Sequence, residues 1–300
     1  MAIVSLLSAK GSPGVTTSAL LIAALWPRPV LLLDADPGGG DIAVRVPAAD
    51  GGILNAERGL LPLLTSARRG LSADDVLAQA QPVSGGTAVV CGLTSPEQAI
   101  AAAQTWPTLA AAVAELGRDP GERDQGEQDP AGLDPIRPDP IGPDPIGLDP
   151  IGRGAADRGP IDVVVDAGRL DARPIHLALL RESSVVVLVL RDDVCGVLHA
   201  RERLRTLGTV LRRADGLRPR VGLLVVGDAR RRDAGAAAAL VRAAGDWVED
   251  FGMLPLDPAG ARVFDGARHP RPERTALVRS GRVLLEAIVA AAHADVRRAA

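Results

Sequence analysis

Lysine and aromatic residues are nearly missing from this 300-residue sequence. It has one lysine, Lys10, among 34 basic residues, no tyrosine, and an aromatic content of 2%. Proteins that read single-stranded nucleic acid stack bases on aromatic side chains, so that class is disfavoured. The two cysteines, Cys91 and Cys195, lie inside apolar segments. They are expected to be small core residues of a reduced protein, with no disulfide or metal role.

Long hydrophobic runs are also missing. No apolar segment approaches the roughly 20 residues that span a bilayer, and the N-terminus lacks the cationic region and cleavage site of a signal peptide. The sequence therefore predicts a soluble, cytoplasmic protein with no transmembrane segment. The net charge of −3 hides an asymmetry, because residues 1–160 carry 11 basic and 19 acidic groups, whereas residues 161–300 carry 23 and 18. The basic half could attract nucleic acid, anionic lipid or an acidic partner.

Apolar, β-branched runs alternate with helical stretches along most of the chain. The runs predict strands at Ala2–Leu7, Val30–Leu33, Thr87–Val90, Ile161–Val165, Ser184–Leu190, Val221–Val226 and Met253–Pro255. Helices are predicted at Thr17–Leu25, Asp74–Gln79, Glu97–Leu116, Val194–Arg212, Ala234–Ala244 and Ala276–Arg298. Continuous apolar strands between helices predict an α/β fold, with a doubly wound, mostly parallel sheet flanked by helices.

One segment interrupts this alternation. Between Asp129 and Arg153 a five-residue unit occurs five times, as DPAGL, DPIRP, DPIGP, DPIGL and DPIGR. Its prolines disfavour both helix and central strand, so residues 118–160 are predicted to be a disordered or polyproline-like insertion. A slipped repeat expanded in a surface loop is the favoured interpretation, and a partner-docking tether is the alternative. Either way, the sequence predicts one domain whose two parts are residues 1–117 and 161–300.

The lone lysine opens a glycine-bearing loop between the first predicted strand and the first helix. Lys10–Thr17 reads KGSPGVTT. Gly11 and Gly14 allow backbone N–H groups to wrap a phosphate in front of a helix N-terminus, and Thr16 stands where a Mg²⁺-binding hydroxyl belongs. The lysine of G-x-x-x-x-G-K-[ST] is replaced by Val15. Taken alone, the loop is also compatible with a structural turn capped by a threonine.

Carboxylates end two later strands. Asp34 and Asp36 follow the second predicted strand within DADPGGGD, where one could lie near Mg²⁺ and the other near an attacking water. Asp166 and Gly168 end the Ile161–Val165 strand. Such an aspartate can hold a metal-bound water, and the glycine lets a loop respond to a γ-phosphate. Ligands bind at the carboxyl ends of strands in doubly wound sheets, which disfavours the alternative of solvated turns.

Together these motifs resemble the MinD/ParA superfamily of deviant-Walker P-loop ATPases, which are SIMIBI-type NTPases. Within it, the chain is similar to the MinD-like group found beside pilus-assembly and secretion genes in high-GC bacteria. The family loop K-G-G-x-G-K-[ST]-[ST] matches Lys10–Thr17, its D-x-D-P segment matches Asp34–Pro37, and its D-x-x-x-D-x-x segment matches Asp162–Gly168. Gly252–Asp257 is similar to the family's G-x-x-P-x-D segment beside the base. The matched stretches cover most of the chain outside the repeat insertion.

The resemblance implies a role for each matched residue. Lys10 would be the signature lysine that reaches the phosphates of the partner subunit in a nucleotide-sandwich homodimer, and Asp36 would orient or activate the hydrolytic water. Thr16 would bind Mg²⁺, Asp166 would hold it through water, and Asp34 would support the metal shell. The remaining contacts to ATP would come from Gly11, Ser12, Pro13, Gly14, Val15, Thr16, Thr17, Pro255 and Asp257.

Two positions depart from the family loop. Ser12 replaces a glycine, and Val15 replaces the lysine that neutralises charge on the β- and γ-phosphates. Losing one such charge-stabilising donor typically costs about 10²–10³ in rate. The chain is therefore expected to bind ATP and Mg²⁺ with slow or absent hydrolysis. Whether it is an enzyme stays open; if active, it is a weak ATPase.

The resemblance implies a nucleotide-dependent dimeric switch that positions or assembles a pilus or secretion apparatus through protein partners, peripherally at the membrane or nucleoid. Two alternatives stay open. One is a chromosome or plasmid partitioning ATPase that binds DNA nonspecifically, and the other is a pseudo-ATPase scaffold without turnover. A metabolic enzyme of the same superfamily would need substrate residues or cluster cysteines that the sequence does not offer.

Arginines gather in the second half of the chain. The helix predicted at Val194–Arg212 carries four, Arg213 directly follows it, and 230–232 is a run of three. A solvated helix face is favoured because arginine is used almost wherever lysine would be; weak nonspecific DNA binding and docking to protein or lipid are the alternatives. The terminal helix Ala276–Arg298 lacks the bulky aromatic face and lysines of membrane-binding helices, which favours a packed helix.

Overall fold

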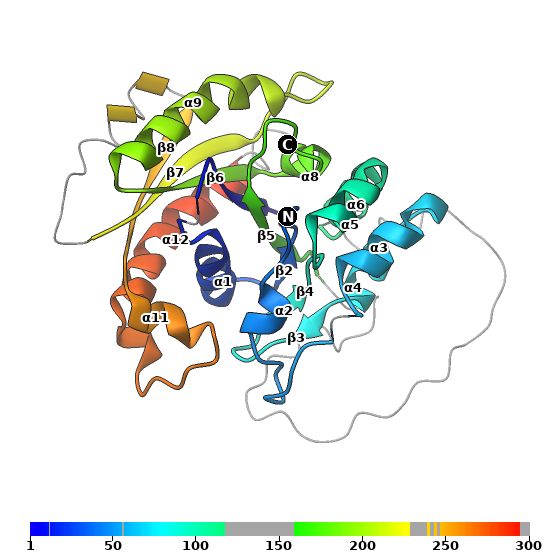
Figure 1. Ribbon diagram of the computed structural model, residues 1–300, viewed down its shortest axis with the longest axis horizontal. Helices are drawn as coiled ribbons and strands as arrows, with labels where there is room; N and C mark the ends of the chain where they lie inside the picture. Colours follow the sequence, from blue (N-terminus) through cyan, green and yellow to red (C-terminus); the bar gives the residue numbers. More distant parts are fainter. Residues whose placement is uncertain are drawn as a thin grey trace.

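The computed structural model describes residues 1–11, 13–55, 57–117, 159–228, 239–240, 243–244 and 247–294. They form one eight-stranded sheet in the order β3-β4-β2-β5-β1-β6-β7-β8 (Figure 1). All neighbouring strands are parallel except β3, which is antiparallel to β4. The strands are β1 (Ile3–Ser8), β2 (Val30–Asp34), β3 (Gln81–Pro82), β4 (Ala88–Val90), β5 (Asp162–Arg169), β6 (Val185–Arg191), β7 (Arg220–Gly227) and β8 (Val248–Pro255). The predicted doubly wound, mostly parallel sheet is confirmed.

Helices fill most of the connections between the strands. They are α1 (Val15–Leu25), α2 (Ile42–Arg45), α3 (Leu60–Ser66), α4 (Ala73–Ala78), α5 (Pro96–Ala101), α6 (Trp106–Glu115), α8 (Leu177–Glu182), α9 (Val194–Val210), α11 (Pro258–Val263) and α12 (Ala276–Ala294). In the part of the chain that the structure describes, no helix is long and apolar enough to cross a membrane. The predicted repeat insertion, apart from Gly159–Pro160, and most of the helix predicted at Ala234–Ala244 lie outside the described residues.

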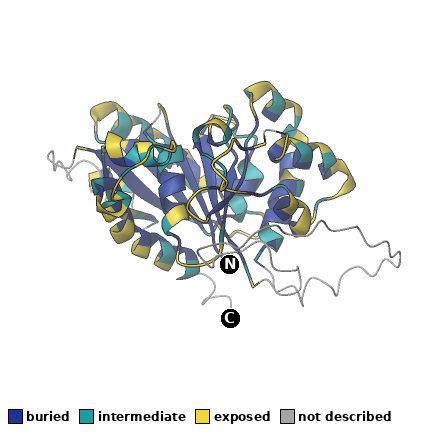
Figure 2. Ribbon diagram, turned by 90° about the horizontal axis from the view of Figure 1, so that it is seen from below, coloured by how far each residue is buried: buried dark blue, intermediate teal, exposed yellow. Residues whose placement is uncertain are grey.

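Each face of the sheet supports its own hydrophobic core. Alternate side chains of β1 illustrate the division: Ile3 and Leu7 pack with α3, α4, α6, α8 and α9, whereas Val4 and Leu6 pack with α1 and α12. Figure 2 shows the buried strands between helices whose outer surfaces are exposed. Burial on both faces explains why the strands are apolar at nearly every position instead of at alternate ones.

The chain changes direction across the sheet at β1. This strand pairs with β5 on one side and β6 on the other, with Leu6 opposite both Asp166 and Val187. The elements that precede β6 build one half of the sheet, and the later ones build the other half. Such a switch point leaves a crevice at the carboxyl ends of the strands. The loop that follows β1 lies there.

Two predicted elements differ from the observed ones. The helix predicted at Glu97–Leu116 is divided into α5 and α6 by a short 3₁₀ turn, Ala103–Thr105. Pro107 occupies the first turn of α6, where its missing N–H costs nothing, whereas inside a continuous helix it would break a hydrogen bond. The strand predicted at Met253–Pro255 is longer, because β8 begins at Val248. As an edge strand it tolerates polar residues that hide its first half in the sequence.

The cysteines differ in their environment. Cys91 is buried as predicted, but Cys195 is exposed in the first turn of α9, so its prediction as a core residue is wrong. Both thiols are free. The terminal helix α12 buries one face, including Leu284 and Ile288. This burial confirms the predicted packed helix as far as Ala294.

Candidate functional site

A loop of unusual backbone conformation connects β1 to α1. Gly14 precedes the helix with φ of 101° and ψ of 34°, and Gly11 has φ of 75°. Both values lie in the left-handed region that glycine adopts without strain. The first intrahelical bond runs from the Ser18 N–H to the Gly14 carbonyl over 2.9 Å. The N–H groups of the first turn of α1 precede this bond and have no intrahelical partner, and such groups at a helix N-terminus can bind an anion. Ser12 lies outside the described residues.

Two carboxylates flank this loop on neighbouring strands. Asp34 at the end of β2 lies opposite Asp166 of β5 in the parallel register, and both are essentially inaccessible to solvent. The Asp34 Oδ2 accepts a hydrogen bond from the Ile42 N–H at 3.3 Å, but within the described residues its Oδ1 has no partner. Gly40 and Gly92 pack so closely on Asp34 that a Cβ at either would collide with the carboxylate.

Asp166 is better supplied with partners. Its Oδ1 accepts the Gly168 N–H at 3.1 Å, and the Thr16 side chain favours the ionised form of the carboxylate and so acts to lower its pKa. Burial nevertheless raises the pKa of Asp166 to about 6. Burial and the neighbouring charge of Asp166 raise the pKa of Asp34 well above its ordinary value. Two buried acids with raised pKa values are costly for stability, and such pairs are concentrated at functional sites.

Asp36 lies directly against the end of β5. A Cβ on Gly168, whose φ is 57°, would collide with the Asp36 carboxylate, so a larger residue there would push the two segments apart. The Gly38 N–H donates to Asp36 Oδ1 at 2.7 Å. Burial is the main cause that raises the pKa of Asp36, and the charges of Asp41 and Asp171 add to it. The structure thus brings the predicted Asp34–Pro37 and Asp162–Gly168 segments, called the switch segments below, into contact.

These residues fit Mg²⁺ and a nucleotide phosphate. Mg²⁺ prefers hard oxygen ligands and usually takes only one or two from the protein, with the others supplied by phosphates and water. The Thr16 hydroxyl and the Asp166 carboxylate supply such oxygens, and the orphaned Oδ1 of Asp34 is a buried acceptor that a bound water or cation would satisfy. Among the described residues, no cluster of three or more His, Cys, Asp or Glu side chains forms a metal site.

The predicted base-side segment lies beside the same loop. Pro255 and Asp257 share a small cavity of about 150 Å³ with Gly14 and Thr17, and Arg191 at the end of β6 also lines it. The Asp257 carboxylate caps two helices, since Oδ1 accepts from the Gly260 N–H at 3.0 Å and Oδ2 from the Leu277 N–H at 3.1 Å. Burial opposes ionisation, but these backbone donors outweigh it and lower the pKa of Asp257. Base contacts from this segment stay a prediction.

Lys10 and Val15 take opposite positions. Lys10 is exposed and lines an open cavity of about 430 Å³ with Arg169 and residues of α9, including Glu202 and Arg203. Val15 is 7% exposed and packs into the core beneath α1. The lysine is therefore on a surface accessible to a second molecule, whereas the valine presents no polar group to the loop.

One cation near the loop was not predicted. Arg45, the last residue of α2, donates from Nη2 to the Thr17 Oγ1 at 3.3 Å, and its charge lowers the pKa of Asp166. Nothing in the sequence pointed to it, because 28 residues separate the two partners and a four-residue helix leaves no periodic pattern. Arg191 is likewise revealed only by the position of β6 beside β1.

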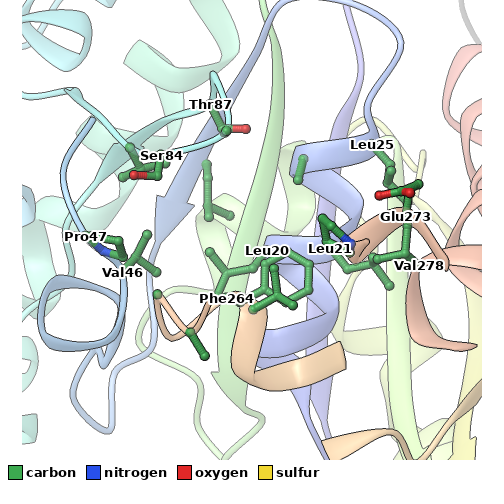
Figure 3. Close-up of a pocket in the computed structure, with 18 of the residues that line it drawn as sticks. Leu20, Leu21, Leu25, Val46, Pro47, Ser84, Thr87, Phe264, Glu273 and Val278 are labelled. Carbon is green, nitrogen blue, oxygen red and sulfur yellow. The ribbon is translucent and has the colours of Figure 1, made fainter. Parts of the chain in front are cut away.

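Another cavity, of about 420 Å³, lies on the other side of α1 (Figure 3). Leu20, Leu21 and Leu25 of α1 face Val46 and Phe264 across it. The charged residues in its lining are Arg268 and Glu273, and neither belongs to the carboxylate cluster. Its chemistry is that of an apolar recess, so the glycine loop with its carboxylates is the better candidate for the functional site.

Several arginines of the second half have local partners. Arg213 pairs with Glu182 at 3.2 Å and Asp215 at 3.4 Å, and Arg205 pairs with Glu202 at 3.5 Å. Such exposed pairs contribute little energy, and they are consistent with the solvated-face interpretation. The run at 230–232 lies outside the described residues.

Comparison with known proteins identifies the fold. No family model matches the sequence, and no curated protein matches it. Among solved structures, a ParA family ATPase from Chlorobium tepidum TLS aligns with a TM-score of 0.62 at 13% identity, covering 96% of this chain and 97% of that one. The septum site-determining protein MinD complexed with Mg-ADP, from Pyrococcus horikoshii OT3, gives 0.57 at 17%, covering 96% and 95%. A plasmid partition protein from Borrelia burgdorferi gives 0.56 at 14%, covering 97% and 99%. The chain has the P-loop NTPase fold of these proteins over nearly its whole length.

Proposed function

We propose that this protein binds ATP with Mg²⁺ and acts as a nucleotide-dependent dimeric switch, with slow or absent hydrolysis. The observation that carries the proposal is the buried Asp34–Asp166 pair beside a glycine loop and a helix N-terminus. Two raised-pKa carboxylates, one with an orphaned oxygen, are costly for the protein alone. A bound cation would compensate for both.

Each residue of the site has a task that follows from its position. The loop backbone and the N-terminus of α1 hold the phosphates, while Thr16 and Asp166 offer oxygens to Mg²⁺, which neutralises phosphate charge when bound. Asp36, held by the Gly38 N–H, orients the hydrolytic water or shifts when that water is displaced. Because Asp36 touches Gly168, a change at the phosphate moves both switch segments together. The partner surface would change with them.

The sequence resemblance to the pilus- and secretion-associated MinD-like group favours a role in positioning or assembling such an apparatus. The Val15 substitution favours a second candidate, a pseudo-ATPase scaffold that keeps the fold and the partner surface without turnover. A partitioning role through nonspecific DNA binding is the third candidate, and strong salt dependence of DNA binding would distinguish it.

Calorimetric titration with ATP and with ADP, in the presence of Mg²⁺, tests the proposal. The wild type is compared with Lys10→Ala and with Arg282→Ala, which removes one charge from the exposed face of α12, and light scattering gives the mass of each sample. Tight ATP binding and an ATP-dependent dimer, both lost in Lys10→Ala and kept in Arg282→Ala, are expected. No binding by the wild type would leave the scaffold as the function.

A further inference from the structure

The phosphate loop needs a cation that its own sequence does not supply. P-loops place a lysine at the start of the helix, where it reaches the β- and γ-phosphates. Here Val15 holds that position and is buried among core side chains. A triphosphate bound to the loop would therefore lack one of its usual charge partners.

Four cations lie around the loop in the part of the chain that the structure describes. Lys10 and Arg169 line the open cavity against α9, and Arg191 lines the small cavity at Gly14. Among the four, Arg45 is the one hydrogen-bonded to a side chain in the first turn of α1. Its position therefore distinguishes it from the others.

Arg45 is held in place from two sides. Its Nε donates to the Asp265 Oδ1 at 2.8 Å, and its Nη2 donates to the Thr17 Oγ1 at 3.3 Å. The side chain is 26% exposed, so it is partly withdrawn from water yet still open to a ligand. A guanidinium has five N–H donors in a planar fork that suits phosphate oxygens. Donors thus remain for a ligand after both contacts are made.

We propose that Arg45 replaces the loop lysine, binding a phosphate oxygen of the nucleotide within the same subunit while Asp265 holds its side chain in place. This inference rests on the proposed function. The ligand class is a nucleoside di- or triphosphate, because the Arg45 guanidinium is bonded to Thr17 in the first turn of α1, where the proposed function places the phosphate chain.

Calorimetry with ATP and Mg²⁺ on four variants tests the inference. Arg45→Gln should weaken binding about 10–100-fold, the effect typical of one charge-assisted hydrogen bond. Arg45→Lys should recover part of it as a point charge. Adding Val15→Lys to Arg45→Gln should restore affinity to within about tenfold of the wild type, because one loop lysine then supplies the missing charge. Arg282→Gln is the matched control and should bind as the wild type does.

A structural role for Arg45 predicts a different pattern. Asp265→Asn removes the ion pair but keeps the guanidinium, so under the proposal it weakens ATP binding far less than Arg45→Gln does. Equal losses in these two variants, or wild-type affinity in Arg45→Gln, would overturn the inference and leave the proposed function standing. If the wild type itself binds no nucleotide, both fail. Urea unfolding of each nucleotide-free variant shows whether a lost affinity reflects a lost fold.

Discussion

Neutralising Asp166 is expected to stabilise the nucleotide-free protein at neutral pH. Burial raises the pKa of this carboxyl from 3.8 to about 6. Between these values the unfolded chain has lost a proton that the folded protein still holds, so the free energy of unfolding falls as the pH rises. Once the pH exceeds the folded pKa, the loss amounts to about 3 kcal/mol, since a tenfold change in proton affinity corresponds to about 1.4 kcal/mol.

Asp166→Asn tests this effect, because the amide keeps an oxygen for the Gly168 N–H, which donates to Asp166 Oδ1 at 3.1 Å in the wild type. Removing the charge of Asp166 also relieves one cause of the raised pKa of Asp34, so both changes act in the same direction. Urea unfolding of both proteins between about pH 4.5 and about pH 8 should give a stability difference that grows toward about 3 kcal/mol in favour of the variant. Asp250→Asn is the control, since this exposed aspartate makes a similar bond to the Gly252 N–H at 2.9 Å. It shows what an Asp→Asn change at a similar bond contributes outside the site.

A different outcome would refute the reasoning. If Asp166→Asn is less stable than the wild type near about pH 8, the ionised Asp166 carboxylate of the wild type must be well solvated or paired in the folded protein. The argument that the site stores a cost for its ligand would then fail. The same result would weaken the reason for expecting a cation between Asp34 and Asp166.

The remaining predictions concern stability away from the loop. His176 is buried beside Trp106, with ring centroids 5.9 Å apart, and burial lowers its pKa from 6.5 to about 4. As the pH falls, the unfolded chain binds this proton before the folded protein does, so the wild type loses up to about 3 kcal/mol of its free energy of unfolding. His176→Phe should remove this loss, and urea unfolding from about pH 7 to about pH 4.5 measures it. Asp162 is buried at the amino end of β5, away from the loop, and accepts the Ala2 N–H at 2.7 Å and the Trp26 indole N–H at 3.0 Å. Asp162→Ala should cost about 3 kcal/mol or more by leaving both donors unpaired, while calorimetry shows an unchanged ATP affinity.

The fold was largely predictable because burial on both faces leaves a strong signal. A run such as Val185–Leu190 is apolar at every position, and this pattern distinguishes a central parallel strand from an exposed one. Elements with little burial escaped prediction. The two-residue β3 has no periodicity to read, and the edge strand β8 carries Glu249, Asp250 and Gly252 among its first five residues. A single residue can also divide a helix without a visible change in composition, as Pro107 does where α6 begins.

The site was predictable only where its chemistry follows a strand end. Asp34 and Asp166 could be placed because the register of a parallel sheet aligns carboxyl ends at one edge. The sequence also showed that Val15 stands where the family loop has a lysine, but it gave no indication of the cation that we propose in its place. Arg45 reaches Thr17 through a short helix whose orientation depends on tertiary packing and on the Asp265 ion pair. A contact that long-range packing creates leaves no local pattern in the sequence. The departure at Val15 could therefore be read from the sequence, whereas the contact between Arg45 and Thr17 required the structure.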